Sequence, residues 1–246
     1  MPRSKGLSEI LFSKDRGEKF IKEDFNIILK KNVETIVKKQ IEVGIDYISD
    51  GEMSKISYAT YIKDRIDGFS GESERRAPAD LDDFPEYKEK IAKSGGTPTY
   101  SRPCCTNALK IKDKDSLNKD LENFKNSLDK NNHQKAFMNA ASPGVINVFM
   151  PNRFYKTDDE YLHKLSEIMA IEYETITKSN IQVQLDCPDL ALARHMNFKE
   201  LSEQEFLKRA EIQIECLNEA LTNVDVNLTR MHICWGNYEG PHTHDI

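Results

Sequence analysis

The architecture can be worked out from one short stretch, Ile181-Gln182-Val183-Gln184-Leu185, which Asp186-Cys187-Pro188 closes. Its length and its β-branched residues are those of a strand. Apolar residues at helical spacing precede it and predict a helix over 158–178. Ser202-Glu203-Gln204-Glu205 follows it and has the form of a capping box, which marks the start of another helix. This order favours a parallel α/β fold, because parallel strands need a crossover that is usually a helix.

The same alternation recurs on both sides of this stretch. Further helices are predicted over 23–43, 116–128 and 206–221. Further strands are predicted over 45–50, 136–141 and 230–235, with a weaker candidate over 102–109. Five strand candidates result, which is three fewer than a closed (β/α)8 barrel contains.

Two parallel architectures compete, a doubly wound sheet and a barrel. No G-x-G-x-x-G turn follows any predicted strand, which disfavours a dinucleotide-binding fold. Polar side chains instead follow four of the strands: Asp50 and Glu52, Asn139 and Ser142, Asp186 and Asp189, Cys234 and Asn237. Barrels build their active sites at that rim. The sequence therefore predicts an incomplete (β/α)8 barrel of the TIM type, as a single domain over 1–246.

Composition narrows the class of protein. The 246 residues are 38% hydrophobic and 31% charged, and the net charge of −6 argues against a nucleic-acid partner. No apolar run is long enough for a membrane span, and Met1-Pro2-Arg3-Ser4-Lys5-Gly6 does not resemble a secretory signal. Five scattered cysteines are too few for a disulfide framework. We expect a cytoplasmic protein without membrane contacts, in an oligomeric state that the sequence leaves open.

One polar insert interrupts the alternation over about 70–103. Its many charged residues are typical of a disordered segment, whereas Phe84, Tyr87 and Tyr100 are typical of a loop that covers a substrate. Both interpretations stay open.

His232-Ile233-Cys234 is the sharpest chemical signal. Residues two apart on a strand share a face, so the imidazole and the thiol converge. A catalytic zinc uses three ligands of these types and leaves one position open. The pair also occurs by chance in core strands. A closed four-ligand site with His242 and His244 is a weaker alternative to their being loop groups. The remaining histidines, His133, His163 and His195, are predicted to be surface or packing residues.

Asp50-Gly51-Glu52 and Asp186 add carboxylates at the same rim. Each could cap a helix, or could bind the ammonium group of a substrate. Their combination with a thiol and an imidazole favours a site for something cationic.

Three stretches resemble the cobalamin-independent methionine synthases, in the form of their catalytic C-terminal domain. They are 44–52, 181–188 and 232–237, while 54–61 and 139–144 are typical of the stand-alone branch that includes epoxyalkane:coenzyme M transferase. The resemblance implies a (β/α)8 barrel with zinc held by His232 and Cys234. It also implies that Glu52 and Asp186 hold the ammonium group of the acceptor.

The activity implied is methyl transfer from 5-methyltetrahydrofolate, often polyglutamylated, to the thiol of homocysteine, which gives methionine. Lys55, Arg65 and Arg153 are candidates for the polyglutamate tail. The alternatives are an alkyl transfer of the epoxyalkane:coenzyme M type, or a non-catalytic remnant.

Two departures from the family pattern qualify this. The family places a later Cys well beyond the H-x-C pair, but the chain ends at Ile246, so we expect a fragment without the last two strands and most of the first. Cys187 stands where methionine synthases usually have an acidic residue.

Overall fold

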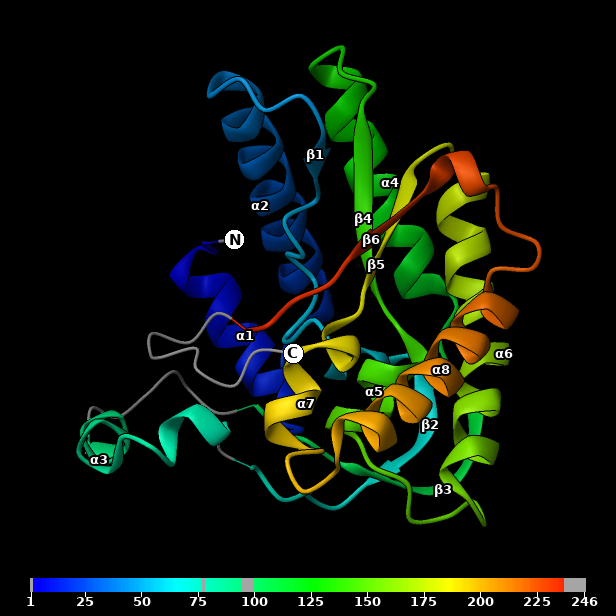
Figure 1. The fold of residues 1–246 in the computed structure, drawn as a ribbon. Helices are drawn as coiled ribbons and strands as arrows, with labels where there is room; N and C mark the ends of the chain where they lie inside the picture. Colours follow the sequence, from blue (N-terminus) through cyan, green and yellow to red (C-terminus); the bar gives the residue numbers. More distant parts are fainter. Residues whose placement is uncertain (1, 77, 94–99, 237–246) are drawn as a thin grey trace.

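The central element is a parallel sheet of four strands, in a computed structural model that describes residues 2–76, 78–93 and 100–236. The strands lie in the order β1 (Ile48–Ser49), β4 (Ala136–Ala141), β5 (Gln182–Asp186) and β6 (Thr229–His232) (Figure 1). Each strand runs parallel to its neighbour. The predicted parallel α/β fold is therefore confirmed.

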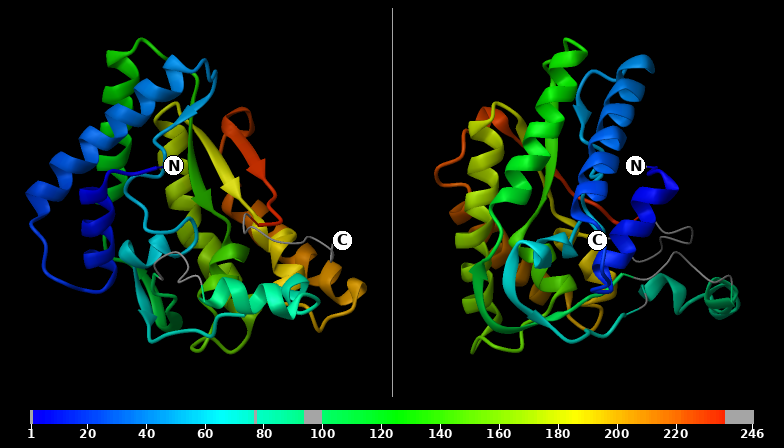
Figure 2. Two further views of the ribbon diagram at one scale, coloured as in Figure 1. Left: turned by 90° about the vertical axis from the view of Figure 1, so that its left-hand side faces the viewer. Right: turned by 180° about the vertical axis from the view of Figure 1, so that it is seen from behind.

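Four long helices form a layer against this sheet (Figure 2). They are α2 (Lys22–Glu42), α4 (Asp115–Lys130), α6 (Asp158–Lys178) and α8 (Glu203–Ala220). Each contacts the next along the chain, α2 contacts β1, and α6 contacts β4 and β5. Ser202 and Glu205 form the predicted capping box at the start of α8. The predictions of 158–178 and 136–141 match α6 and β4.

The strand predicted over 102–109 lies in a different place from the other four. β3 (Cys104–Ile111) pairs antiparallel with β2 (Ile66–Ser70) in a separate two-stranded sheet, so it does not extend the parallel sheet. Sequence periodicity is the same for both kinds of pairing, which is why the pattern could not reveal the partner. Gly68, at a φ of 111°, interrupts the apolar pattern of β2 next to a register shift.

The remaining helices and turns are shorter. The helices are α1 (Lys5–Asp15), α3 (Pro85–Lys93), α5 (Pro143–Phe149) and α7 (Leu192–Met196), and 3-10 turns cover Thr60–Asp64, Ala79–Leu81, Pro188–Leu190 and Val226–Leu228. The described part of the 70–103 insert is ordered, because it contains α3 and the turn at 79–81, where Asp80 is fully buried. No helix in the described ranges is long and apolar enough to cross a bilayer.

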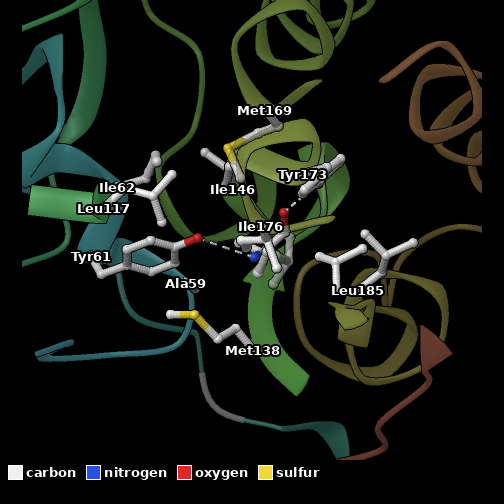
Figure 3. Close-up of a cluster of buried hydrophobic side chains, with 14 of the residues drawn as sticks. Ala59, Tyr61, Ile62, Leu117, Met138, Ile146, Met169, Tyr173, Ile176 and Leu185 are labelled. Carbon is white, nitrogen blue, oxygen red and sulfur yellow. Dashed lines mark hydrogen bonds between the residues drawn. The ribbon is translucent and has the colours of Figure 1, made fainter. Parts of the chain in front are cut away.

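The two faces of the sheet differ in chemistry. Met138, Ala140, Val183 and Leu185 are buried on the face that packs against the helices. Tyr61 and Tyr173 close the end of this core, since their hydroxyls bond the N–H and the carbonyl of Ala141, at 3.4 and 2.6 Å (Figure 3). Strand alternation places Asn139, Gln184, Asp186 and His232 on the opposite face. That face carries the candidate site.

The sheet stays open within the described residues. β1 and β6 are its two edges, and no pairing between them closes a barrel there. The strand predicted over 45–50 pairs only at Ile48 and Ser49, while Ile45 and Tyr47 are exposed.

Candidate active site

Asp186 and His232 meet at the carboxyl ends of β5 and β6. The two residues are direct partners in the parallel register, and Asp186 Oδ1 lies 3.2 Å from His232 Nδ1. The Asp186 side chain is 8% exposed, whereas the His232 side chain is 49% exposed. A largely buried carboxylate therefore orients a half-exposed imidazole.

The other contacts of Asp186 hold it in place. Asn139 Nδ2 donates to Oδ2 at 2.9 Å, and Gln184 Nε2 donates to Oδ1 at 3.0 Å. Both oxygens thus have a partner from the sheet itself. With Nδ1 of His232 protonated toward this carboxylate, Nε2 is the ring nitrogen that can accept a further ligand.

Cys234 lies two residues after His232, just beyond the end of β6. Its backbone is fixed, because Leu192 N–H donates to the Cys234 carbonyl at 3.1 Å. The thiol is only partly buried, and Gly236 N–H donates to Sγ at 3.3 Å. β6 ends at His232, short of the strand predicted over 230–235, so the convergence of the imidazole and the thiol stays a prediction.

His232 and Cys234 suit a zinc ion by their donor chemistry. They offer one nitrogen and one sulfur, and the Asp186–His232 bond is of the kind that orients zinc-bound histidines. In the described ranges, no third His, Cys or carboxylate joins these two in a group with all ligand atoms within 4.8 Å of one another. Asn237, His242 and His244 lie outside the described residues.

Glu52 lies at the other side of the sheet, after β1. It adopts a left-handed φ of 55°, and its N–H bonds Asp50 Oδ1 at 3.1 Å. No hydrogen bond of the described residues joins Glu52 directly to Asp186, although Lys55 from the same turn donates to the Asn139 carbonyl. One oxygen of Glu52, Oε1, is buried and has no hydrogen-bond partner.

Arg3 supports this turn, although no pattern in the sequence pointed to it. Its guanidinium donates to the carbonyls of Glu52 and Lys55, at 2.8 and 2.6 Å. Burial lowers the pKa of Arg3, while the charges of Glu52 and Asp50 oppose that shift. Burial also raises the pKa of the Asp50 carboxyl.

Aromatic and basic side chains gather around Phe149. The ring of Tyr58 packs edge-on against Phe149, with 5.5 Å between the ring centres. The charges of Cys234 and Asp186 contribute to the raised pKa of Tyr58. The Arg102 guanidinium lies 4.6 Å from the centre of the Phe149 ring, and its Nε is buried without a hydrogen-bond partner. Burial is the main reason that the pKa of Tyr58 is raised.

The polar insert reaches this region through His195. The His195 ring stacks on Trp235 at 4.4 Å, and its Nδ1 lies 3.1 Å from Asp80 of the insert. His195 is fully buried, which agrees with its prediction as a packing residue.

The three basic residues considered for a substrate tail have other positions. Arg65 is buried and ion-paired to Asp120 and Glu172, at 2.7 and 2.8 Å. Lys55 is buried, with Nζ 4.1 Å from the Tyr61 ring centre. Arg153 has an exposed side chain beside β3. A cavity of about 490 Å³ between α1, α2 and α4 ends on Lys55 and Arg65, away from His232 and Cys234.

The rim beyond β5 contains a second buried acid. Asp189 accepts a 2.6 Å hydrogen bond from Ser142, and burial raises the pKa of Asp189 to about 6. Cys187, which departs from the family pattern, is buried, and burial raises the pKa of its thiol. Its Sγ lies 3.6 Å from the Leu185 carbonyl, so Cys187 acts as a small core residue.

Curated relatives exist for almost the whole chain. A methionine synthase from Sulfolobus acidocaldarius is 26% identical over 238 residues, and one from Saccharolobus solfataricus is 23% identical over the same length. Each alignment covers 96% of this chain but only 60% and 61% of the relative. No protein-family model matches the chain.

The chain is a relative of the methionine synthases. It spans about 60% of the length of these curated relatives. Solved structures agree in fold. A B12-independent methionine synthase from Shewanella sp. W3-18-1, in complex with selenomethionine, superposes with a TM-score of 0.63 at 17% identity, covering 89% of this chain and 55% of that one.

A second structure, of a putative vitamin-B12 independent methionine synthase from Listeria monocytogenes, gives a TM-score of 0.62 at 16% identity. It covers 96% of this chain and 64% of the other. These comparisons confirm the predicted resemblance to B12-independent methionine synthases.

Proposed function

We propose that this chain carries the metal-binding and acceptor-binding part of a methyltransferase that moves a methyl group from 5-methyltetrahydrofolate to the thiol of homocysteine. The observation that carries the proposal is the Asp186–His232 pair beside Cys234, in a chain related to methionine synthases. The four parallel strands would then belong to one (β/α)8 barrel domain. Five free cysteines suit the reducing cytoplasm as its location.

His232 and Cys234 are the residues that would hold zinc. When bound, zinc lowers the pKa of a coordinated thiol, so that an acceptor thiol is deprotonated at neutral pH. Asp186 fixes the orientation of His232 through the 3.2 Å bond to Nδ1. Cys234, whose carbonyl accepts a hydrogen bond from Leu192 N–H, would supply its sulfur to the same ion.

Glu52 is the better candidate for the ammonium group of the acceptor. Its buried Oε1 lacks a partner, and an ammonium group supplies the missing donors. Asp186 was predicted to share this role, but both of its oxygens already accept hydrogen bonds from protein groups. We therefore assign Asp186 mainly to the orientation of His232, with a smaller contribution to the acceptor.

Arg102 is our candidate for the carboxylates of the folate donor. Its buried Nε has no partner, and it lies beside the aromatic pair of Tyr58 and Phe149. An arginine binds a carboxylate through two parallel N–H groups, and the aromatic rings suit the flat pterin.

Acceptor binding by titration calorimetry, with zinc supplied, tests the proposal. We expect homocysteine to bind, Cys234→Ser to abolish binding, and Glu52→Gln to weaken it by about 1.5–3 kcal/mol, as for hydrogen bonds to charged groups. Cys104→Ser, in a buried cysteine outside the proposed zinc ligands, is the matched control. Tighter binding of coenzyme M than of homocysteine would favour the epoxyalkane-type transfer, and binding of neither would contradict an acceptor site.

A further inference from the structure

A second group of metal-binding side chains lies on the outer helices. His163 of α6 and Cys216 and Glu219 of α8 place their ligand atoms within 4.8 Å of one another. The two helices lie side by side in Figure 1 and pack against each other. None of the three residues belongs to the strand-end site or to its supporting contacts.

The helix pairing fixes this convergence. Cys216 and Glu219 are three residues apart, so they share one face of α8. Arg209 bonds Asp158 at 3.3 Å on one side of the group, and Asn223 bonds Glu174 at 3.3 Å on the other. Contacts on both sides set the register of α8 along α6, which holds His163 opposite Cys216.

The distances are close to those of a tetrahedral site. Cys216 Sγ lies 3.8 Å from His163 Nδ1. Zn–S and Zn–N bonds of about 2.3 and 2.05 Å at a tetrahedral angle give a sulfur–nitrogen distance of roughly 3.6 Å. Glu219 Oε2 lies 2.8 Å from the same Nδ1, and zinc ligation needs roughly 3.4 Å. The Glu219 side chain is 53% exposed, so its carboxylate can rotate back by this amount.

The surroundings of the thiol are acidic. Burial raises the pKa of Cys216, and the charges of Glu219, Asp159 and Glu215 act in the same direction. These acids attract a divalent cation, and coordination reverses the effect on the thiol, because a bound metal takes the place of its proton. Cys216 is fully buried while His163 is half-exposed, so the sulfur sits below the ion and water can complete the coordination.

We propose that His163, Cys216 and Glu219 form a second site for zinc, or for a divalent cation of similar softness, which joins α6 to α8. One nitrogen, one sulfur and one carboxylate oxygen form a donor set that selects such ions over magnesium or calcium. Binding forms the metal–sulfur bond and releases the thiol proton to solvent. This inference is independent of the methyltransferase proposal, because it uses different residues on a different surface.

Metal stoichiometry of the 246-residue chain tests the site, measured by elemental analysis after equilibrium dialysis against micromolar zinc. We expect Cys216→Ser and His163→Gln each to lower the zinc content by one equivalent. His163 is half-exposed, so its variant keeps the fold even if the buried cysteine variant does not. Glu215→Gln removes one of the acidic charges near Cys216 without removing a proposed ligand. This variant should retain the full zinc content.

Cobalt substitution gives a second readout. The wild type and Cys234→Ser should both show a thiolate-to-cobalt absorption band, and Cys216→Ser in the Cys234→Ser background should abolish it. Equal zinc content in the wild type, Cys216→Ser and His163→Gln would overturn the proposal. A loss in Glu215→Gln as large as in His163→Gln would also overturn it, because attraction of the ion by surface charge would then suffice.

Discussion

Two polar clusters of this molecule differ in how completely their groups are paired. In the first, Arg65 lies between Asp120 and Glu172, and Tyr61 donates to Glu172 at 2.5 Å. In the second, at the strand ends, Asp186 is paired, but the imidazole of His232 is half-exposed and Cys234 is only partly buried. The charged groups of the buried cluster are paired with one another. The strand-end cluster has donor atoms that remain available to a ligand.

The electrostatics of the buried cluster agree with a framework role. Burial opposes the charge of Arg65, but Glu172 and Asp120 outweigh it and raise the pKa of Arg65. Burial likewise opposes the charge of Glu172, but Arg65 and Lys55 prevail and lower the pKa of Glu172. At Asp120 the balance is reversed, because burial outweighs Arg65 and raises the pKa of that carboxyl. The charged groups of this cluster nevertheless have one another as partners. The comparison teaches that unpaired donor and acceptor positions, more than charge or burial, distinguish a site from a framework.

The largest expected effect comes from opening the closed cluster. Arg65→Met leaves Asp120 and Glu172 buried without their cation, and we expect a loss of about 3–5 kcal/mol in the free energy of unfolding. Urea denaturation measures this loss. Arg16→Met, which breaks the exposed pair with Glu18, should cost far less, because solvent screens an exposed ion pair. Similar losses in the two variants would remove the distinction between the clusters.

Asp189 is a buried acid at the rim, and its raised pKa predicts how stability depends on pH. Its pKa is raised from 3.8 to about 6, so between roughly pH 4 and 6 the folded chain holds a proton that the unfolded chain has released. The folded state therefore loses stability as the pH rises through this window, by about 3 kcal/mol in total.

Asp189→Asn should remove this part of the pH dependence. The variant's free energy of unfolding, relative to that of the wild type, should rise by about 3 kcal/mol from pH 4 to pH 7. Asp129→Asn, at an exposed position, is the matched control and should leave the profile unchanged. Parallel pH profiles for the wild type and Asp189→Asn would show that Asp189 is not the buried acid described here.

Gly144 tests the packing around the same acid. A Cβ at Gly144 would overlap the Asp189 carboxylate, so we expect Gly144→Ala to cost about 1–3 kcal/mol in chemical denaturation. Gly6 lies in α1 with no atom closer than 4.0 Å to such a Cβ, so Gly6→Ala should be neutral or stabilising. An equal response of the two glycines would contradict the close approach of Asp189 to α5.

Local signals predicted much of this fold correctly. Thr157 and Ser202 cap α6 and α8 through their own side chains, so the starts of both helices could be read from adjacent residues. The sequence did not reveal the pairing partner of the strand predicted over 102–109. That partner, β2, lies more than thirty residues earlier, and Gly68 breaks its apolar pattern.

Long-range contacts explain the other omissions. Arg65 meets acids that follow it by 55 and 107 residues, and no spacing rule connects them. Arg3 precedes α1, so both α1 and α2 separate it in the sequence from the Glu52 turn to which it donates. His163 and Cys216 occupy ordinary helical positions, and only the packing of α6 on α8 brings them together.

The central claim is that Asp186 orients His232 for a metal ion, and zinc affinity measured by chelator competition tests it most directly. The measurement uses Asp186→Asn in a His163→Gln background, so that the outer site does not contribute. Asn keeps the shape of the side chain, so stability should change by less than about 1 kcal/mol, while zinc affinity should fall 10–100-fold, as for other residues that orient metal-bound histidines. Unchanged zinc affinity would contradict the account of this site.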